Sequence, residues 1–287
     1  MTWQTTRFQI DLRRPQVMGI VNVTPDSFSD GGQHATTLAA LRHCEQLVRD
    51  GADLLDIGGE STRPGAAPLS VQDELARVLP VIAGALSLGV PLSVDTYKPQ
   101  VMQAALDLGA DIINDVWALR WRAPGDALTG SQVVADHPNC GVCLMHMHRE
   151  PHTMQVQPMQ GDVVPQVLSF LKHSAHDLQG LGVEKSRILL DPGIGFGKTV
   201  AQNFALLQRQ RELCAAGYPL LAGWSRKSSL AGMVPPGAAP LSAQERLAPS
   251  LAAALLAAER GAAVLRVHDV RETVQALQVL RAITSMP

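Results

Sequence analysis

The chain has 287 residues, of which 46% are hydrophobic and 17% charged, so it can bury a large core and is too apolar to be disordered. A net charge of -2 and an isoelectric point near 6.5 exclude a general nucleic-acid binder, which needs a basic surface. No apolar stretch reaches the roughly 18 residues of a membrane span, and the N-terminus lacks a signal-peptide apolar region. We expect a soluble, cytoplasmic protein with neither a nucleic-acid nor a membrane partner.

Short apolar runs alternate with helical patterns along the chain. Residues 1–16 alternate at Phe8, Ile10 and Leu12, which indicates a short strand or hairpin. Buried strands are expected at residues 17–22, 54–57, 91–95, 111–114, 142–147, 188–191, 220–224 and 264–267. Helices are expected at residues 35–50, 71–88, 99–108, 131–137, 163–180, 203–216, within 243–259 and at 270–284. Ser242 and Glu245 have capping-box spacing before the penultimate helix.

Eight strand–helix units in about 250 residues are typical of an α/β protein with a (β/α)8 TIM barrel, whose loops after the strands form one catalytic face. A doubly wound open sheet is the alternative, because strand order cannot be read from one sequence. No linker or repeat interrupts the pattern. We expect a single domain, with residues 1–16 as an N-terminal extension and residues 17–287 as the barrel.

Two cysteines, Cys140 and Cys143, form a Cys-x-x-Cys pair. Such pairs occur in redox sites and in halves of zinc sites. This pair begins an expected strand instead of opening a helix, and the four cysteines of the chain supply no second pair to complete a zinc site. We interpret both as buried structural thiols.

Polar residues follow nearly every expected strand, and in a barrel they would meet at one mouth. A cationic group suits phosphate oxygens and comprises Arg63, Arg226, Lys227, Arg266 and His268. A second group suits the N–H edge of a flat heterocycle and comprises Asp95, Asn114 and Asp191. The remaining strand-end residues are Asn22, Glu60, Thr62, Asp115, His146, His148 and Ser225. A salt-bridge network at the rim is the alternative, although rim charges need not fall at strand ends.

Three motifs near these strand ends resemble known sites only in part. The segment 187–199, RILLDPGIGFGKT, approaches a phosphate-binding P-loop but has Pro192 where that motif needs glycine. His146 and His148 could begin a metal site, yet alternation places them on the side of Leu144, which favours a packing or orienting role. The chain has no Gly-x-Ser-x-Gly elbow, so Ser225 is not expected to be an acyl nucleophile.

Eight blocks of the sequence resemble those of the dihydropteroate synthase family. They are VMGIVNVTPDSFSDGG (17–32), DIGGESTRPGA (56–66), SVDTYKP (93–99), DIINDV (111–116), LMHM (144–147), LLDPGIGFGKT (189–199), SRKS (225–228) and RVHDV (266–270). They occur in the family's order, in register with the eight expected strands. The family is a (β/α)8 barrel, usually a homodimer. It joins 6-hydroxymethyl-7,8-dihydropterin diphosphate to p-aminobenzoate with Mg²⁺, giving 7,8-dihydropteroate and pyrophosphate in folate biosynthesis.

The resemblance also implies a role for individual residues. The pterin ring would be held by Asp95, Asn114, Asp191 and Lys227. The diphosphate would be bound by Asn22, which is also the Mg²⁺ ligand, and by Thr62, Arg63, Arg266 and His268. The p-aminobenzoate pocket would consist of Thr62, Pro64, Phe196 and Ser228. The catalytic residues would be Arg63, Lys227, Arg266 and His268.

The implied chemistry needs no nucleophile or general base from the protein. Mg²⁺ and the cationic group stabilise the departing diphosphate, while loops 23–34 and 58–70 close over it. The pterin carries the transient cation at its methylene carbon, and the neutral aniline nitrogen attacks. Ser228 and the start of the following helix would receive the p-aminobenzoate carboxylate. Ile194, Trp224 and the Trp-rich residues 117–131 depart from the usual family pattern and affect pocket shape.

Three other functions are alternatives to dihydropteroate synthesis. A related pterin-binding domain transfers a methyl group from a reduced folate to a corrinoid protein, but it has little use for a cationic group because its substrate carries no diphosphate. A non-catalytic paralogue would be expected to lack Asn22, the 58–66 loop or the SRKS block, and all are present. A metal hydrolase would need further ligands beside His146 and His148.

Overall fold

A computed structural model describes residues 1–24, 32–61, 68–123, 125, 127–150, 153–154 and 156–284. Within them, eight parallel strands form one sheet in the order β8-β7-β6-β5-β4-β3-β10-β9. The strands are β3 (Gln16–Asn22), β4 (Leu54–Gly58), β5 (Leu92–Asp95), β6 (Ile112–Asp115), β7 (Gly141–Met145), β8 (Ile188–Asp191), β9 (Leu221–Ala222) and β10 (Val264–Val267). A parallel bridge between Leu190 and Leu220 brings the two edges of the sheet together. The TIM barrel is therefore confirmed, and the doubly wound sheet is excluded.

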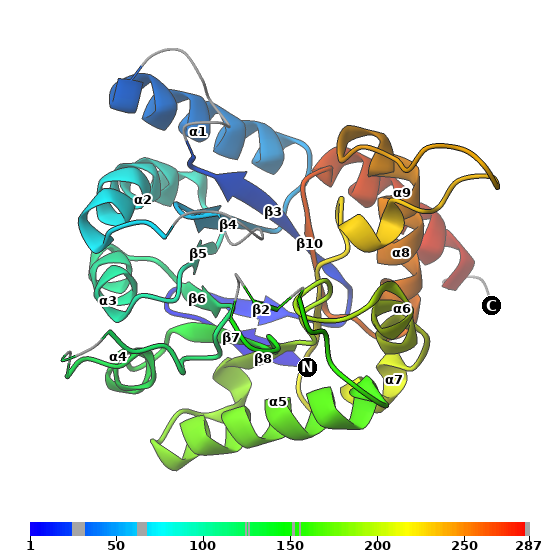
Figure 1. The fold of residues 1–287 in the computed structure, drawn as a ribbon. Coiled ribbons are helices and arrows are strands. Elements are labelled where there is room, and N and C mark those ends of the chain that lie inside the picture. The colour runs from blue at the N-terminus through cyan, green and yellow to red at the C-terminus, as the bar shows by residue number, and fades with distance from the viewer. Residues whose placement is uncertain are drawn as a thin grey trace.

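Helices surround the barrel, as Figure 1 shows. They are α1 (Gly32–Arg49), α2 (Val71–Ala85), α3 (Pro99–Leu108), α4 (Gly130–Asp136), α5 (Val163–Gly180), α6 (Val200–Gln208), α7 (Gln210–Cys214), α8 (Leu247–Glu259) and α9 (Val270–Thr284). Their apolar stripes pack on the outward side chains of the strands, forming the main hydrophobic core. No helix in the described parts of the chain combines the length and apolar character needed to cross a membrane.

Several predicted boundaries differ from those in the structure, and a side-chain cap explains one of them. The helix expected at 203–216 begins at Val200, where Thr199 and Gln202 form a capping box, and it is divided at Arg209 into α6 and α7. The strand expected at 142–147 ends at Met145, and that expected at 220–224 consists of Leu221–Ala222.

Only half of the predicted capping box before α8 is present. The Ser242 N–H donates to the Glu245 carboxylate at 2.8 Å, but a 3-10 turn, Gln244–Arg246, separates these residues from the start of α8.

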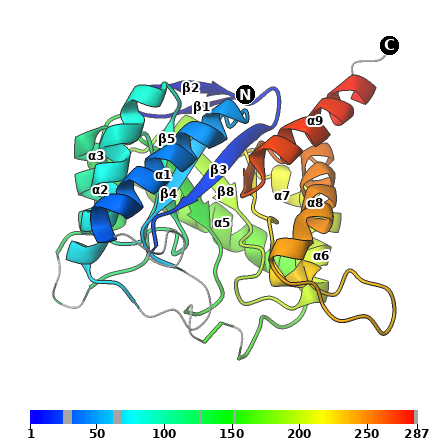
Figure 2. The same ribbon diagram turned by 90° about the horizontal axis from the view of Figure 1, so that it is seen from above.

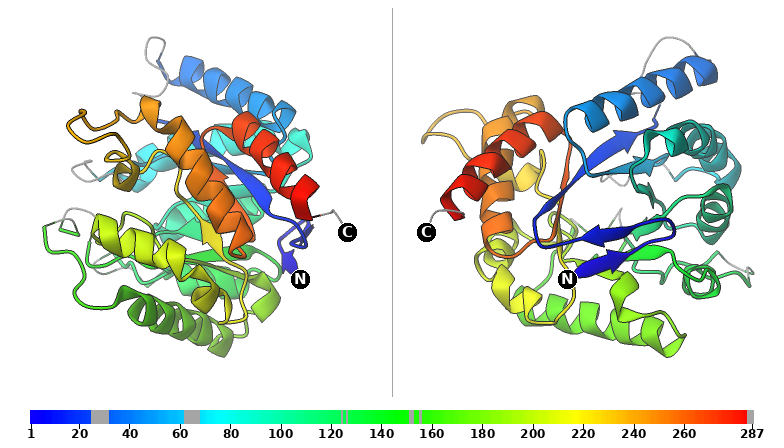
Figure 3. Two further views of the ribbon diagram at one scale, coloured as in Figure 1. Left: turned by 90° about the vertical axis from the view of Figure 1, so that its right-hand side faces the viewer. Right: turned by 180° about the vertical axis from the view of Figure 1, so that it is seen from behind.

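A hairpin closes the N-terminal end of the barrel, in agreement with the sequence pattern. Strands β1 (Thr2–Gln4) and β2 (Gln9–Asp11) pair antiparallel and lie across this end, away from the loops that follow the barrel strands (Figure 2 and Figure 3). Trp3 and Ile10 pack on the lowest inward layer of the barrel: Met18, Leu54, Ile112, Cys143, Leu189, Leu221 and Val264. The Trp3 indole N–H donates to the Arg187 carbonyl at 2.9 Å. This end is thus filled by apolar side chains.

The cysteine pair follows the interpretation made from the sequence. Cys140 and Cys143 are both buried and unoxidised, and Cys143 belongs to the apolar layer beneath the hairpin. Burial raises the pKa of both thiols, so they stay protonated at neutral pH.

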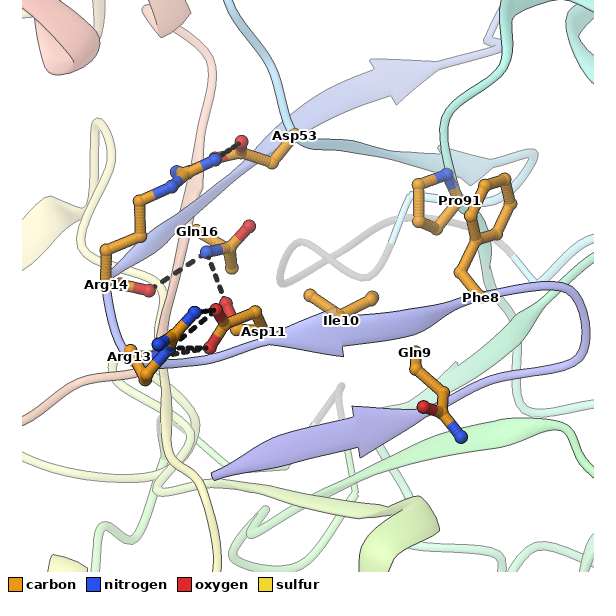
Figure 4. A pocket seen from close by; sticks show the side chains of 9 residues that line it. All are labelled: Phe8, Gln9, Ile10, Asp11, Arg13, Arg14, Gln16, Asp53 and Pro91. Atoms are coloured by element: carbon orange, nitrogen blue, oxygen red, sulfur yellow. Dashed lines mark hydrogen bonds and ion pairs between the residues drawn. The ribbon is translucent and has the colours of Figure 1, made fainter.

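An open hollow of about 480 Å³ lies beside the hairpin (Figure 4). Its charged side chains already pair with one another: Arg13 with Asp11, and Arg14 with Asp53. It lies at the opposite end of the barrel from the predicted strand-end residues, so we do not regard it as the active site.

Candidate active site

Inward side chains from four strands form one polar network at the C-terminal end of the barrel. Arg266 on β10 donates from Nε to Asp56 Oδ2 at 2.5 Å and from Nη2 to Asp95 Oδ2 at 2.6 Å. Asn114 on β6 donates from Nδ2 to the same Asp56 oxygen at 3.1 Å. The parallel register sets Asp95 beside Asn114. The structure therefore brings together three residues, Asp95, Asn114 and Arg266, that the sequence predicted to meet.

Asp56 is the member of this network that the sequence analysis missed. It is fully buried, and its Oδ1 has no hydrogen-bond partner among the described residues. A signal was available, because Asp56 is the one acid in the apolar strand LLDIG and alternates with Leu54, which faces the barrel interior. A buried oxygen without a partner carries a large desolvation cost, and such costs are concentrated at functional sites.

Burial changes the acidity of the two predicted pterin-binding carboxyls. It raises the pKa of Asp95 to about 7, although the Arg266 guanidinium opposes the shift. It also raises the pKa of Asp191, against the Gly193 N–H and the Lys227 ammonium, which favour the carboxylate. Both carboxyls would gain from a ligand that donates N–H groups, because hydrogen bonds to the charged form lower a pKa.

The loop after β8 folds back tightly onto the end of β7. Asp191 Oδ1 accepts the Gly193 N–H at 2.7 Å, and the Phe196 N–H donates to the Gly193 carbonyl at 3.1 Å. Gly193 has φ +67°, and a Cβ there would lie 1.9 Å from the His146 carbonyl oxygen, so only glycine fits. The Lys198 side chain is buried beneath this loop and contacts backbone carbonyls, which removes it from any phosphate site.

An apolar cluster adjoins the polar network at the mouth. It comprises Val116, Met145, Met147, Met154 and Phe196, with Tyr97 and Trp117 packed against it. The Lys227 ammonium lies 4.4 Å from the centre of the Phe196 ring, a cation–π contact. An apolar cluster beside carboxylate and amide groups is suited to a flat heterocycle with a polar edge.

Besides Arg266, two members of the predicted cationic group have partners within the chain, His268 and Arg226. The Ser225 hydroxyl accepts the His268 backbone N–H at 3.1 Å and lies 2.9 Å from the His268 Nδ1 atom. Arg226 pairs with Asp269, in the short segment between β10 and α9, at 2.5 Å. The Asp269 carboxylate thus provides Arg226 with a partner within the chain, in place of the phosphate oxygens expected from the sequence.

Other predicted strand-end residues also turn away from the mouth. His146 lies on the side of Leu144, as expected, and packs edge-to-face against Phe170 of α5, with ring centres 4.9 Å apart. Burial lowers the pKa of His146 to about 2, so it is neutral. Asp115 is buried and accepts the N–H groups of Trp117 at 2.8 Å and Leu119 at 2.6 Å, which makes it a turn-forming residue.

Part of the predicted site lies outside the described residues: Thr62, Arg63 and Pro64, together with most of loop 23–34. The residues beside these gaps are fixed. Asn22 ends β3 opposite Gly58. Glu60 accepts from the Tyr97 hydroxyl at 2.9 Å and pairs with buried Lys98. Ser228 is exposed and begins a 3-10 turn, Ser228–Leu230, so the expected helix with a supporting dipole is reduced to one short turn.

Comparison with known proteins agrees with this geometry. The family model described as pterin binding enzyme matches residues 18–268. The dihydropteroate synthase of Neisseria meningitidis serogroup B is 48% identical, over 98% of this chain and 97% of that protein. The chain belongs to the dihydropteroate synthases within the pterin-binding enzyme family. Dihydropteroate synthases are transferases, so the predicted enzyme class is confirmed and the methyl-transfer, binding-only and hydrolase alternatives lose their support.

Solved structures of the family have the same fold. The Xanthomonas albilineans dihydropteroate synthase with 4-aminobenzoic acid is 48% identical, with a TM-score of 0.89 and complete coverage of both chains. The same enzyme in complex with 7,8-dihydropteroate is 47% identical, with a TM-score of 0.84 and 97% coverage of each chain. The resemblance stated from the eight sequence blocks is thus confirmed for the family, the fold and the enzyme class.

Proposed function

We propose that the polar network and the apolar cluster bind 6-hydroxymethyl-7,8-dihydropterin diphosphate, and that p-aminobenzoate attacks it from the loops above. The observation that carries this proposal is the convergence of Asp56, Asp95, Asn114 and Arg266, beside Asp191 and the Lys227–Phe196 pair. A pterin edge carries ring and amino N–H groups, and three carboxylates with one amide are complementary to it. The apolar cluster would cover one face of the ring.

The diphosphate would be bound by Asn22, Arg63, His268 and Thr62, with Arg266 at the inner edge. Arg266 would both orient the two carboxylates and bind diphosphate, because only its Nε and Nη2 atoms bond to Asp56 and Asp95. A contact with diphosphate would use the remaining guanidinium N–H groups, while the two carboxylates keep their orientation. Ser225 would fix the His268 ring for the same purpose.

Mg²⁺ fits the donor set at the end of β3. No group of three histidine, cysteine or acidic side chains in the described ranges could hold a metal ion by itself. Mg²⁺ does not require such a cage, because it keeps several waters and binds through substrate phosphates and one or two protein oxygens. The Asn22 amide oxygen would provide that protein ligand, and the ion would supply charge neutralisation to the diphosphate.

The residues of this chain would then promote the reaction electrostatically. Cations around the diphosphate stabilise the negative charge that develops as the C–O bond breaks. The electron-rich pterin, held by Asp95, Asn114, Asp191 and Lys227, carries the positive charge left on its methylene carbon. The neutral aniline nitrogen of p-aminobenzoate attacks that carbon and loses a proton to solvent. Phe196 and Ser228, with Thr62 and Pro64, would hold p-aminobenzoate in line for this attack.

We further propose that the protein is a homodimer that acts in the cytoplasm, with residues 17–287 as its catalytic domain and residues 1–16 as an extension. Support for the dimer comes from an apolar face on α6 and α8. Val200 and Leu256 are exposed there, beside a shallow hollow of about 330 Å³ lined by Ala201, Phe204, Ala205, Leu207, Gln208, Leu256 and Arg260. Apolar surface of this kind is typical of contacts between subunits.

The proposal is tested by one assay of the purified protein with both substrates, with and without Mg²⁺. We expect dihydropteroate and pyrophosphate to appear in equal amounts, and we expect excess chelator to stop both. Full turnover in chelator would refute the metal assignment alone. Absence of both products in the complete mixture would refute the proposed reaction.

A further inference from the structure

Lys198 is a buried cation that no part of the reaction described above uses. Its side chain is 3% exposed, and its ammonium group donates to three backbone carbonyls: Gly193 at 2.8 Å, Phe196 at 3.2 Å and His146 at 3.3 Å. An ammonium has three N–H donors, so this arrangement satisfies all of them. No carboxylate forms an ion pair with Lys198 in the described part of the chain. Burying such a charge is costly, and this suggests that the charge itself has a use.

The three carbonyls belong to the segments that form the pterin site. The Gly193 and Phe196 carbonyls lie in the loop between Asp191 and Lys198, and the His146 carbonyl follows β7. The Lys198 ammonium therefore fastens the loop after β8 to the end of the neighbouring strand, β7, through these three hydrogen bonds. Asp191 directly precedes the fastened loop and Phe196 belongs to it, and both are predicted substrate-binding residues.

Lys198 also acts on Asp191 through its charge. Burial raises the pKa of Asp191, and the ammonium groups of Lys227 and Lys198 oppose that rise. Burial lowers the pKa of Lys198 to about 7, while Asp191 supports its charged form. The two groups thus stabilise each other's ionised state without a direct hydrogen bond.

We propose that Lys198 is a positioning residue for the pterin site, which fastens the loop after β8 and keeps Asp191 ionised to accept the N–H groups of the ring. This inference rests on the proposed function, because it gives the Asp191 carboxylate a pterin to bind. Lys198 itself touches neither substrate.

Other charged and titratable groups around Lys198 and Asp191 also affect how pterin binding depends on pH. From β10 and the segment after β9, Arg266 and Lys227 also favour the Asp191 carboxylate. Cys143 on β7 and His146 just after it add no charge to the pair, because burial raises the pKa of the thiol and lowers that of the imidazole. Burial and the neighbouring cations likewise lower the pKa of His148. Protonation of a pterin-binding carboxyl at low pH should reduce pterin affinity, and we call this part of the pH profile the acid limb. Asp95, with a pKa of about 7, contributes a second carboxyl to the acid limb, but Lys198 is not among the charges acting on it.

The test compares Lys198→Met and Lys198→Gln with the control Asn203→Ala. Lys198→Gln removes the charge but keeps two N–H donors for the carbonyls. Asn203 fastens the same loop without a charge: its Oδ1 accepts the Gly195 N–H at 2.9 Å, and its Nδ2 donates to Ser229 at 2.9 Å. Affinity for 6-hydroxymethylpterin is measured by calorimetry from about pH 5 to about pH 8.5, a range that covers the expected carboxyl shifts.

We expect both Lys198 variants to move the acid limb of binding upward by about one pH unit, which weakens affinity about tenfold at the acid end. Asn203→Ala should weaken binding equally at all pH values and leave the limb in place. If the acid limbs of the Lys198 variants coincide with that of the wild type, the inference is wrong while the proposed function stands. If the wild type binds no pterin, the proposed function itself fails.

A reciprocal measurement leaves Lys198 in place and so avoids any failure of its variants to fold. The pKa of the Lys198 ammonium is measured by nitrogen NMR in the wild type and in Asp191→Asn. Because coupling between two sites is mutual, loss of the Asp191 charge should lower the Lys198 pKa by about one unit. An unchanged pKa would overturn the proposed coupling.

Discussion

The two ends of the barrel are built from the same eight strands but differ in what their inward side chains contain. At the N-terminal end, the inward layer is apolar and is closed by Trp3 and Ile10 of the hairpin. At the C-terminal end, the inward layer contains Asp56, Asp95 and Arg266, and Asp56 Oδ1 has no partner among the described residues. One end gains stability from burial, whereas the other carries buried charge at a cost in stability.

Residues that stabilise the fold therefore lie at one end of the barrel, and residues predicted to bind substrate lie at the other. In a (β/α)8 barrel the residues at the C-terminal strand ends serve chemistry, and those at the opposite end serve the fold. Substitutions at the hairpin end should therefore change the free energy of unfolding and leave the ligand affinity of the folded protein unchanged. Substitutions in the mouth should change affinity, pH dependence or both.

The largest effect on stability is expected from Trp3→Ala. It removes a fully buried indole and its hydrogen bond to the Arg187 carbonyl, which should lower the free energy of unfolding by about 3–5 kcal/mol. Pterin affinity of the folded fraction should not change. Urea unfolding and calorimetry check the two statements, with Gln9→Ala, an exposed position on the same hairpin, as the control. A large loss of pterin affinity would contradict the separation of the two ends.

Arg266→Leu should be costly in a pH-dependent way. It leaves Asp56 and Asp95 buried without their cation, a loss of about 3–5 kcal/mol of stability. The raised pKa of Asp95 means that the folded state holds this proton more tightly than the unfolded state. Its contribution is therefore present below the unfolded pKa and is lost as pH rises through about 7. Without Arg266 that pKa rises further, so the variant should be least stable above pH 7.

The control for this prediction is Arg226→Leu, which removes the partly exposed pair with Asp269. Exposed ion pairs contribute about 0–1 kcal/mol, so this variant should stay close to the wild type. Unfolding by urea on both sides of neutrality makes the comparison. A defect in Arg266→Leu that is constant with pH would show that Asp95 does not titrate as described.

Asp191→Asn should weaken pterin binding by about 1–3 kcal/mol, because the amide presents a donor to the N–H edge of the ring. The fold should be retained, since one amide oxygen can still accept the Gly193 N–H. Calorimetry with a pterin ligand provides the measurement. Wild-type affinity would remove Asp191 from the pterin site.

The smallest effect is expected from Ser225→Ala. It removes the hydroxyl beside His268 Nδ1 and should cost about 0.5–1.5 kcal/mol in pyrophosphate affinity, while pterin affinity stays the same. Ser225→Thr keeps the hydroxyl and should restore part of the loss. The affinities of the wild type, Ser225→Ala and Ser225→Thr are measured by titration with pyrophosphate. Equal affinities in all three proteins would mean that Ser225 does not orient His268 for the anion.

The sequence alone determined the eight strand–helix units and the polar groups at the strand ends, whereas closure of the sheet into a barrel was decided by the bridge between Leu190 and Leu220. Eight apolar runs alternate with helical patterns, and most runs stop at a polar residue such as Asp95, Asn114 or Asp191. Both signals are local, since they depend on periodicity and on where a buried strand must end. They are sufficient to predict an α/β protein with parallel strands, and the closed barrel then brings all strand ends to one side.

Only the tertiary structure decided which of these residues bond to one another. Arg266 pairs with Asp56 and Asp95, which lie 210 and 171 positions away, and Arg226 pairs with Asp269, 43 positions away. Lys198, which in sequence resembles a phosphate-binding lysine, points into three carbonyls behind the loop. Residue type and spacing do not specify these directions. A buried charge takes whichever partner the folded chain brings within hydrogen-bond distance, from a distant strand for Arg266 and largely from its own loop for Lys198.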